Sequence, residues 1–278
     1  MKIVNSLSGG RTSSYLAMNY KSDYNIFSMV CNEDVKCGID DKMLMQYAQD
    51  KLSNYVSTFG EFVGTPEDPI IIKTMYQLEQ KLGSEIIWVR GKSMEQVIKD
   101  KKMFPNRSKR FCTTETKIRP IFNYCFMHLE LPIKMRVGFR WDEKERANSF
   151  TEDFKYSLVA NKGEKWRHKW TSKKWREGEF SLINDLVHHY KIHQFWESQD
   201  ILFAKDSNCQ MCFWKDYQQI VENNNNCNAQ IQWAKDLENK NNKRFRFDMT
   251  IEELLKLPIQ LDFKFTDGAG CNSGECMA

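Results

Sequence analysis

The segment Ser8-Gly9-Gly10-Arg11-Thr12-Ser13 follows an apolar run at residues 3–7 and precedes a run with helical spacing at residues 15–18. This order predicts a strand that enters a glycine-rich turn, which then opens a helix. The two glycines allow the backbone to approach a bound group, and the first amides of a helix have no partner within it. Because a helix N-terminus also carries partial positive charge, the segment predicts a site for an anion such as phosphate.

The composition limits the class of protein. The chain has 278 residues, of which 41% are hydrophobic, so it can bury one large core or two small ones. Its formal charge of +4 does not by itself predict a nucleic-acid partner. The N-terminus lacks the pattern of a signal peptide and no apolar stretch has membrane-spanning length, so we expect a cytoplasmic protein with no membrane partner. Nine cysteines in a reducing compartment point to metal, cluster or catalytic thiol chemistry.

Apolar residues recur with strand and helix spacing along the first half of the chain. Strands are predicted at residues 2–7, 25–31, 85–89 and 133–139, and helices at residues 12–20, 40–52 and 93–101. This alternation predicts an α/β fold, with an open, mainly parallel, twisted sheet and helices on both faces. Because ligands bind at the carboxyl ends of such strands, Ser8, Asn32 and Arg140 are expected on the binding edge.

The chain divides into three parts by pattern. Residues 1–150 are predicted to form a nucleotide-binding α/β core, and residues 151–180 a basic, Trp-rich insertion. Residues 181–278 are predicted to be mainly helical, with helices at 186–196 and 217–239, a Cys-x-x-Cys pair and a cysteine-containing tail. His189 and His193 are four residues apart on the first of these helices, and we interpret them as surface or packing residues.

Two further segments carry closely spaced cations. Residues 110–120 contain Arg110, Lys117 and Arg119, which suit phosphate or sulfate oxygens because guanidinium groups bind such oxygens bidentately. Residues 138–146 follow a predicted strand and contain Arg140 and Arg146. Asp142 and Glu143 in the same segment either orient these arginines or hold Mg²⁺. The alternative for both segments is a solvated, salt-bridged loop.

These segments resemble a known superfamily. Residues 8–13 are similar to the PP-loop, Ser-Gly-Gly-x-Asp-Ser, of the ATP pyrophosphatases and adenine nucleotide alpha hydrolases, with Thr12 in place of Asp. Residues 112–120 resemble the Cys-x-x-x-x-Lys-x-x-Pro element of the PAPS and APS reductases in that superfamily. Residues 138–146 resemble their Gly-Ile-Arg-x-Asp-Glu-x-x-Arg segment, and residues 208–213 resemble an Asn-Cys-x-x-Cys-Phe run. The matches occur in the family's order over residues 1–240.

The resemblance implies a PP-loop, HUP-like fold and an adenine nucleotide (ATP, PAPS or APS) as ligand. The predicted nucleotide-binding residues are Ser8, Gly9, Gly10, Arg11, Thr12, Ser13, Asn32, Glu33, Arg110, Arg119, Asp142, Glu143 and Arg146. Asn32 and Glu33 are expected near the adenosine, and the remaining cations near the phosphate or sulfate end.

The resemblance also implies a site for soft metal ligands. APS reductases combine an upstream cysteine element with a later Cys-x-x-Cys to hold a [4Fe–4S] cluster, which here implies Cys112, Cys209 and Cys212 as ligands. A fourth ligand would come from Cys276, Cys271 or Cys227. Four thiolates suit either [4Fe–4S] or zinc, and the alternative is a set of unligated buried thiols.

The resemblance favours a reductive activity. PAPS and APS reductases end in Glu-Cys-Gly-x-His, and Glu275-Cys276 occupies a similar place here without the Gly and His. Cys276 would be the nucleophile, with Lys117 and Arg140 as further catalytic residues and a thioredoxin-like protein as reductant.

Two other functions remain open at this point. In the first, ATP adenylates an acceptor, which sulfur or nitrogen then attacks. The acceptor would be tRNA or DNA bound to the segment from Lys165 to Arg176, whose Trp and basic residues could instead form a hairpin packed on the body. In the second, the chain is a non-catalytic nucleotide-binding module. We also leave a homodimer open.

Overall fold

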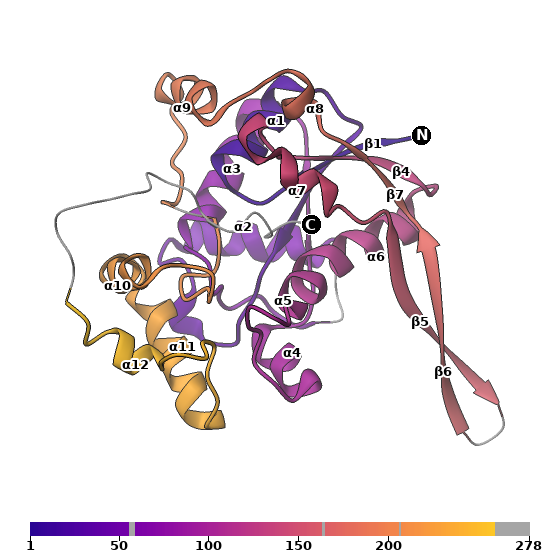
Figure 1. The fold of residues 1–278 in the computed structure, drawn as a ribbon. Coiled ribbons are helices and arrows are strands. Elements are labelled where there is room, and N and C mark those ends of the chain that lie inside the picture. The colour runs from indigo at the N-terminus through magenta and orange to yellow at the C-terminus, as the bar shows by residue number, and fades with distance from the viewer. Residues whose placement is uncertain (56–58, 163–164, 206, 259–278) are drawn as a thin grey trace.

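The computed structural model describes residues 1–55, 59–162, 165–205 and 207–258. Its centre is a five-stranded, wholly parallel sheet in the order β3-β2-β1-β4-β7, flanked by helices (Figure 1). The strands are β1 (Ile3–Leu7), β2 (Tyr24–Met29), β3 (Ile86–Arg90), β4 (Ile133–Val137) and β7 (Arg176–Glu179). The predicted α/β class and the four predicted strands are therefore confirmed, with small shifts at the strand ends.

Helices cover both faces of the sheet because its side chains alternate between two apolar layers. Phe27 and Trp88 point into one layer, where they pack with α1, α2, α3, α8 and α9. Ile26 and Val89, one residue away on the same strands, point into the other layer with α6. The helices of these layers are α1 (Arg11–Asn19), α2 (Lys42–Ser53), α3 (Ile70–Leu82), α6 (Arg119–His128), α8 (Ser181–Asn184) and α9 (His189–Glu197).

A third apolar cluster joins the C-terminal helices to α4 (Met94–Lys101). The helices are α10 (Tyr217–Asn226), α11 (Asn228–Asn241) and α12 (Ile251–Leu254). The prediction of one helix over residues 217–239 was wrong, because Cys227 leaves helical geometry with φ −132° and ψ 53°. The tract of asparagines before Cys227 has low helix propensity, which favours a break there.

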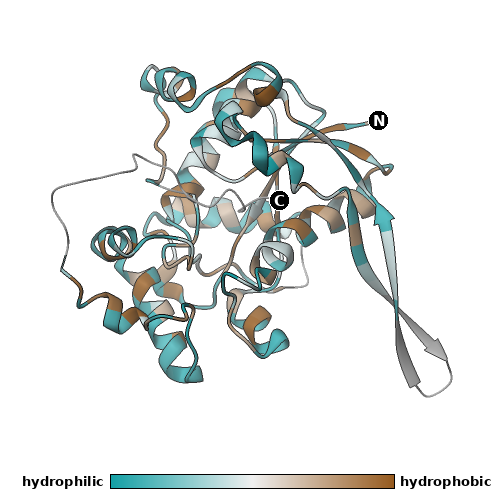
Figure 2. Ribbon diagram, viewed as in Figure 1, coloured by the Kyte–Doolittle hydropathy of each residue, from teal (hydrophilic) through white to brown (hydrophobic). Residues whose placement is uncertain are grey.

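Short helical turns complete the chain around the sheet. They are η1 (Val35–Cys37), α5 (Phe111–Thr113), the π-helix η2 (Thr114–Ile118), η3 (Trp141–Glu143) and α7 (Lys144–Asn148). In Figure 2 the helices carry both hydrophobic and hydrophilic positions, as expected for helices with one face on an apolar layer. No helix in the described part of the chain is long and apolar enough to cross a membrane.

The predicted insertion contains a projecting hairpin and the last strand of the sheet. β5 (Asp153–Lys162) pairs with β6 (Lys165–Lys174) in an antiparallel hairpin that extends away from the body (Figure 1). Trp175 at its base is only 1% exposed, whereas Trp170 is 66% exposed. The side chains around the hairpin tip, Trp166 among them, lie outside the described residues. Residues 176–179 continue into the central sheet as β7, so the sheet extends beyond residue 150.

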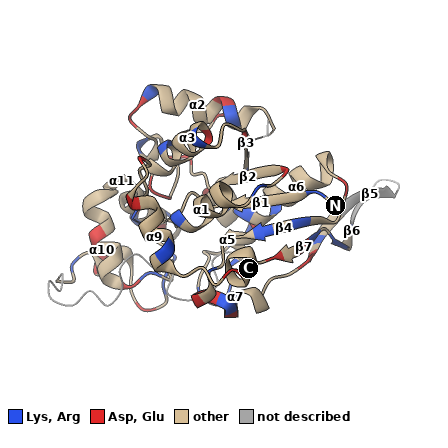
Figure 3. Cartoon of the chain, turned by 90° about the horizontal axis from the view of Figure 1, so that it is seen from above, with Lys and Arg blue, Asp and Glu red and all other residues tan. Residues whose placement is uncertain are grey.

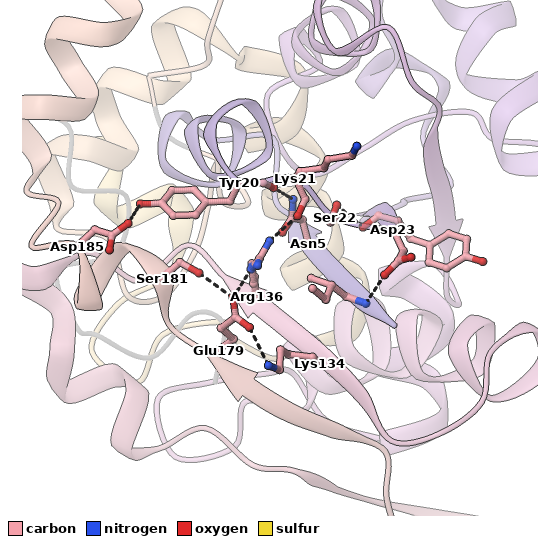
Figure 4. A network of polar contacts seen from close by, with 12 residues as sticks. Asn5, Tyr20, Lys21, Ser22, Asp23, Lys134, Arg136, Glu179, Ser181 and Asp185 are labelled. Atoms are coloured by element: carbon pink, nitrogen blue, oxygen red, sulfur yellow. Dashed lines mark hydrogen bonds and ion pairs between the residues drawn. The ribbon is translucent and has the colours of Figure 1, made fainter. Parts of the chain in front are cut away.

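A row of polar side chains crosses the sheet and fixes the register of four strands. Asn25, Asn5, Arg136 and Glu179 are neighbours in that order on β2, β1, β4 and β7. Asn5 Nδ2 donates to Asn25 Oδ1 at 3.0 Å. Arg136 Nε pairs with Glu179 at 2.5 Å (Figure 4). Basic residues on β4 and acidic residues on β7 are visible in Figure 3. A shift by one residue would place these groups against apolar partners.

The strand order reverses between β1 and β4. The chain adds β2 and β3 on one side of β1, and then adds β4 and β7 on the other. In open parallel sheets, the crevice at such a reversal, outside the carboxyl ends of the strands, is where ligands bind. Residues 8–13 and 138–146 follow the ends of β1 and β4, so the topology brings both segments to this crevice.

We expect Trp175→Ala to lower the free energy of unfolding by about 3–5 kcal/mol, because the buried indole packs against Phe122 and Phe154. Trp170→Ala in the same hairpin should change it by less than about 0.5 kcal/mol. Urea denaturation of both variants measures this difference. Equal losses would contradict the docking of the hairpin base on the body.

Candidate anion-binding site

A pocket of about 120 Å³ lies at the reversal of strand order, and we call it the switch-point pocket. Its lining combines the glycine-rich loop, the end of β4 and the segment around α9. The residues are Ser8, Gly10, Arg11, Thr12, Ser13, Lys117, Val137, Gly138, Phe139, Arg140, Glu143, Arg146, His189, Ile192, His193, Ala204, Lys205, Ser207 and Asn208. The structure therefore brings together residues 8–13, Lys117 and residues 138–146, which the sequence singled out separately.

The glycine-rich loop is held in place by its own hydroxyl groups. Ser13 Oγ donates to the carbonyl of Gly10 at 3.1 Å, and the amide of Ser8 donates to Ser13 Oγ at 3.1 Å. No side chain caps the N-terminus of α1, whose N-cap residue is Gly10. The first amides of this nine-residue helix therefore remain available to an anion, as the sequence predicted.

Three glycines allow neighbouring segments to contact the loop. Gly9 has φ +77°, and a Cβ there would lie 2.6 Å from a methyl group of Ile71. A Cβ on Gly10 would lie 2.8 Å from Ser207 Oγ, and one on Gly138 would lie 3.2 Å from the backbone of Ser13. Side chains at these positions would separate the loop from α3, from residue 207 and from the end of β4.

Two arginines reach the pocket from the segment after β4. Arg140 pairs with Asp142 at 3.1 Å and with Glu143 at 3.3 Å, and donates to Thr12 Oγ1 at 3.3 Å. Arg146 pairs with Glu143 at 2.6 Å. Asp142 and Glu143 thus orient the two guanidinium groups, which is one of the two roles predicted for them. Mg²⁺ binding by these carboxylates stays a prediction.

Lys117 forms a buried ion pair with Glu67, a residue that the sequence analysis missed. Lys117 Nζ lies 2.8 Å from Glu67 Oε1, and the Glu67 side chain is 1% exposed. Burial opposes the charge on Lys117, but the carboxylate of Glu67 outweighs it, so the pKa of Lys117 is raised. Lys117 therefore stays protonated beside any anion in the pocket.

A second, smaller cavity of about 40 Å³ adjoins the first, and we call it the cysteine cavity. Cys112, Cys209 and Cys212 all line it, and Lys117 and Asn208 line both cavities. Burial raises the pKa of Cys112 to about 11 and raises that of Cys209 well above its ordinary value. Both thiols are therefore protonated at neutral pH.

The metal prediction is not resolved by this arrangement. Among the residues that the structure describes, no group of three or more His, Cys, Asp or Glu side chains is arranged to hold a metal ion. Cys271 and Cys276, both considered as fourth ligands, lie outside the described residues. The role of Cys276 as nucleophile therefore stays a prediction. Cys227 packs at the start of α11. A [4Fe–4S] or zinc site stays a prediction.

Six predicted nucleotide-binding residues do not line the switch-point pocket: Gly9, Asn32, Glu33, Arg110, Arg119 and Asp142. Arg119 pairs with Glu115 one turn earlier at 2.7 Å, and its guanidinium lies over the Phe154 ring. Arg110 lines the cysteine cavity instead, with its guanidinium 5.5 Å from the centre of the Trp214 ring. Asn32 is buried in a bridge with residue 64, and Glu33 accepts a hydrogen bond from Ser93 at 2.7 Å.

The pocket also contains residues that the sequence analysis assigned elsewhere or missed. His189 and His193 were interpreted as surface or packing residues, yet both line it, together with Lys205 and Ser207. Burial and the nearby Arg140 lower the pKa of His189. The four-residue spacing of the histidines indicated that both lie on one face of a helix. Only the packing of α9 on α1 shows that this face is directed toward the pocket.

Comparisons with protein-family models, with curated proteins and with solved structures found no match to this chain. The functional argument therefore depends on the geometry of the two cavities and on the sequence motifs.

Removing one member of the buried pair should leave the other charge uncompensated. We expect Lys117→Met to lower the free energy of unfolding by about 3–5 kcal/mol, and Glu67→Gln in the same chain to restore part of the loss. Lys2→Met breaks an exposed pair with Asp23 and should cost far less, because solvent screens such a pair. Urea denaturation distinguishes these cases. A loss for Lys117→Met no larger than that for Lys2→Met would contradict the burial of the pair.

Alkylation should report the raised pKa of Cys112. At about pH 7.5 we expect iodoacetamide to modify Cys112 at least about tenfold more slowly in the folded protein than in urea, because a pKa of about 11 leaves little thiolate. The folded-state rate should rise with pH as the thiolate forms. Peptide mass spectrometry measures both rates. Equal rates at neutral pH would show an accessible, ordinary thiol.

Proposed function

We propose that this protein is an enzyme that binds an adenine nucleotide with its phosphates in the switch-point pocket. It would act at the bond to the α-phosphorus, or at the sulfur joined to the α-phosphate in a sulfonucleotide. The observation that carries the proposal is the convergence of an uncapped helix N-terminus and five cationic side chains at the reversal of strand order. The cations are Arg11, Lys117, Arg140, Arg146 and Lys205. Specificity for adenine is inferred from the PP-loop resemblance.

The charge of the pocket favours a polyanion over a neutral ligand. Among the lining residues that the structure describes, Glu143 is the one carboxylate, and it is already bound to Arg140 and Arg146. The arginines are held by these ion pairs before any ligand arrives. Groups oriented in advance stabilise developing negative charge on a leaving nucleotide without reorganising during the reaction. The pocket is therefore suited to both binding and bond cleavage at a phosphate.

In the reductive form of the proposal, the acceptor of the sulfonate is Cys276. Its thiolate would attack the sulfur of APS or PAPS, forming an S–S bond while the S–O bond to the phosphate breaks and AMP or PAP leaves. A thioredoxin-like dithiol would then release sulfite and become a disulfide. Lys117 and Arg140 would stabilise the charge on the departing phosphate.

A second form is supported by the position of the cysteine cavity. Because Lys117 and Asn208 line both cavities, an acceptor in the cysteine cavity would lie beside the α-phosphate of ATP. An acceptor oxygen would displace pyrophosphate and become adenylated, and sulfur or nitrogen would then displace AMP. tRNA or DNA could supply that oxygen, and the projecting hairpin was the surface predicted to hold it.

Binding is the first test of the proposal. We expect calorimetry on anaerobically prepared protein to detect ATP–Mg²⁺, APS or PAPS, and Arg140→Ala to weaken the binding at least about tenfold, because charged hydrogen bonds contribute roughly 1.5–3 kcal/mol. Arg119→Ala removes the same charge outside the pocket and should change the affinity less than about threefold. Preference for APS or PAPS supports reduction, and preference for ATP supports adenylation. No binding of any of the three would refute the proposal.

Measuring sulfite release distinguishes the reductive form of the proposal from the adenylating form. We expect Cys276→Ser to abolish sulfite release from APS or PAPS while nucleotide affinity is retained, because only the sulfur nucleophile is removed. Cys125→Ser, at a buried thiol on the apolar face of α6, is the control for a non-catalytic cysteine. Sulfite release by Cys276→Ser would exclude the reductive form. Nucleotide binding without any product would indicate the non-catalytic module.

A further inference from the structure

A basic and aromatic surface lies next to the cysteine cavity. It is formed by Arg107, Lys243, Arg244 and Phe247, which we call the Phe247 surface. Phe247 is 71% exposed and lines two grooves, of about 390 Å³ and about 180 Å³. Lys243 and Arg244 line the larger groove, and Arg107 lines the smaller one. An exposed aromatic ring therefore stands between cations on two sides.

The cations of this surface are available to a partner. Within the described residues, Arg107, Lys243 and Arg244 form no ion pair with a carboxylate, although Lys243 Nζ donates to the carbonyl of Lys102 at 2.7 Å. Of the described residues, Asp248 is the one carboxylate lining either groove, and it is bound to Arg246 at 3.2 Å. The surface thus carries an excess of positive charge, with Glu238 and Glu253 acting on Arg244 through longer-range electrostatic interactions.

The exposed ring is held on a rigid support. Phe245, two residues before it, is 1% exposed and packs on Phe104 with ring centres 4.5 Å apart. Arg246, directly before it, is buried and donates to the carbonyls of Phe213 and Lys215 at 3.2 Å and 2.9 Å. The backbone leading into Phe247 is therefore anchored by two consecutive buried residues. Ordering this ring on binding would cost little conformational entropy.

The surface is continuous with the cysteine cavity. The guanidinium groups of Arg107 and Arg110 each lie 5.5 Å from the centre of the Trp214 ring. Arg110 and Trp214 line the cysteine cavity, and Arg107 lines a groove beside Phe247. Arg246 also links the loop of Phe247 to the segment just after Cys212. A chain bound on the surface would pass the mouth of that cavity.

We propose that the Phe247 surface binds single-stranded nucleic acid. Cations spaced along a groove bind successive phosphates, and an exposed aromatic ring between them stacks an unpaired base. An acidic protein segment would satisfy the cations but would leave the ring of Phe247 without a matching group. A duplex keeps its bases stacked within the helix, so the ring would gain no base from it. This inference concerns binding only and does not depend on the proposed reaction.

The test is fluorescence anisotropy of a labelled oligothymidylate of about 20 nucleotides, longer than the roughly 4–16 that one single-strand-binding domain covers. No adenine nucleotide is present, so the result is independent of the switch-point pocket. We expect Phe247→Ala to weaken binding about 5- to 150-fold through lost stacking. Lys243→Ala with Arg244→Ala should reduce the slope of log K against log salt by about 1.4.

Lys36→Ala with Lys42→Ala is the matched control, because it removes the same charge from exposed positions that line neither groove. It should leave affinity within about twofold. The proposal is overturned if Lys169→Ala with Lys173→Ala, in the projecting hairpin, loses binding while the Phe247 variants retain it. It is also overturned if polyglutamate of equal charge displaces the oligonucleotide as well as unlabelled oligothymidylate does, which would indicate an acidic protein partner. Tighter binding of a duplex than of the single strand would overturn it as well.

Discussion

The close contacts at Gly9, Gly10 and Gly138 are the constraint on which the candidate site depends. A Cβ at Gly9 or Gly10 would lie 2.6–2.8 Å from a neighbouring side chain, and one at Gly138 would lie 3.2 Å from the backbone at Ser13, so the neighbours would have to move. The loop after β1 is therefore contacted by α3, by the end of β4 and by residue 207. The pocket forms because the three glycines allow all of these segments to contact the loop at the same time.

The charges of the site are positioned by other charges. Arg140 and Arg146 are bound to Asp142 and Glu143, and Lys117 is bound to the buried Glu67. Each pair costs desolvation energy, which a structure tolerates when the geometry is good and the orientation is useful. A cation that is already oriented loses little freedom when an anion binds. Preorganisation of this kind is typical of sites that stabilise negative charge.

The C-terminal helices add a second layer of organisation around the cysteines. They pack on α4 rather than on the central sheet, and Arg246 connects their last loop to the Cys-x-x-Cys segment. The cysteine cavity therefore lies between the α/β core and the C-terminal part. Lys117 and Asn208 line both this cavity and the switch-point pocket, so a ligand in either cavity would lie beside the same two side chains.

Local patterns were sufficient to predict four of the five strands of the sheet, the loop of residues 8–13 and the α/β class. These features follow from hydrophobic periodicity and from the backbone freedom of glycine, which are properties of neighbouring residues. The same reasoning pointed to Arg140 and Arg146, which follow a strand with a recognisable end and which line the pocket. It joined α10 and α11 into one helix, because the break at Cys227 depends on packing as well as on propensity.

Contacts between residues far apart in the chain determined which side chains reach the pocket and how the sheet is completed. Which cations face the pocket depends on ion pairs that a linear pattern does not reveal: Arg119 is bound to Glu115, whereas Lys117, two residues earlier, reaches Glu67. β7 joined the sheet because Glu179 meets Arg136 on the neighbouring strand, and His189 and His193 reached the pocket because α9 packs on α1. Such contacts join residues far apart in the chain, so their energies appear only once the chain has folded.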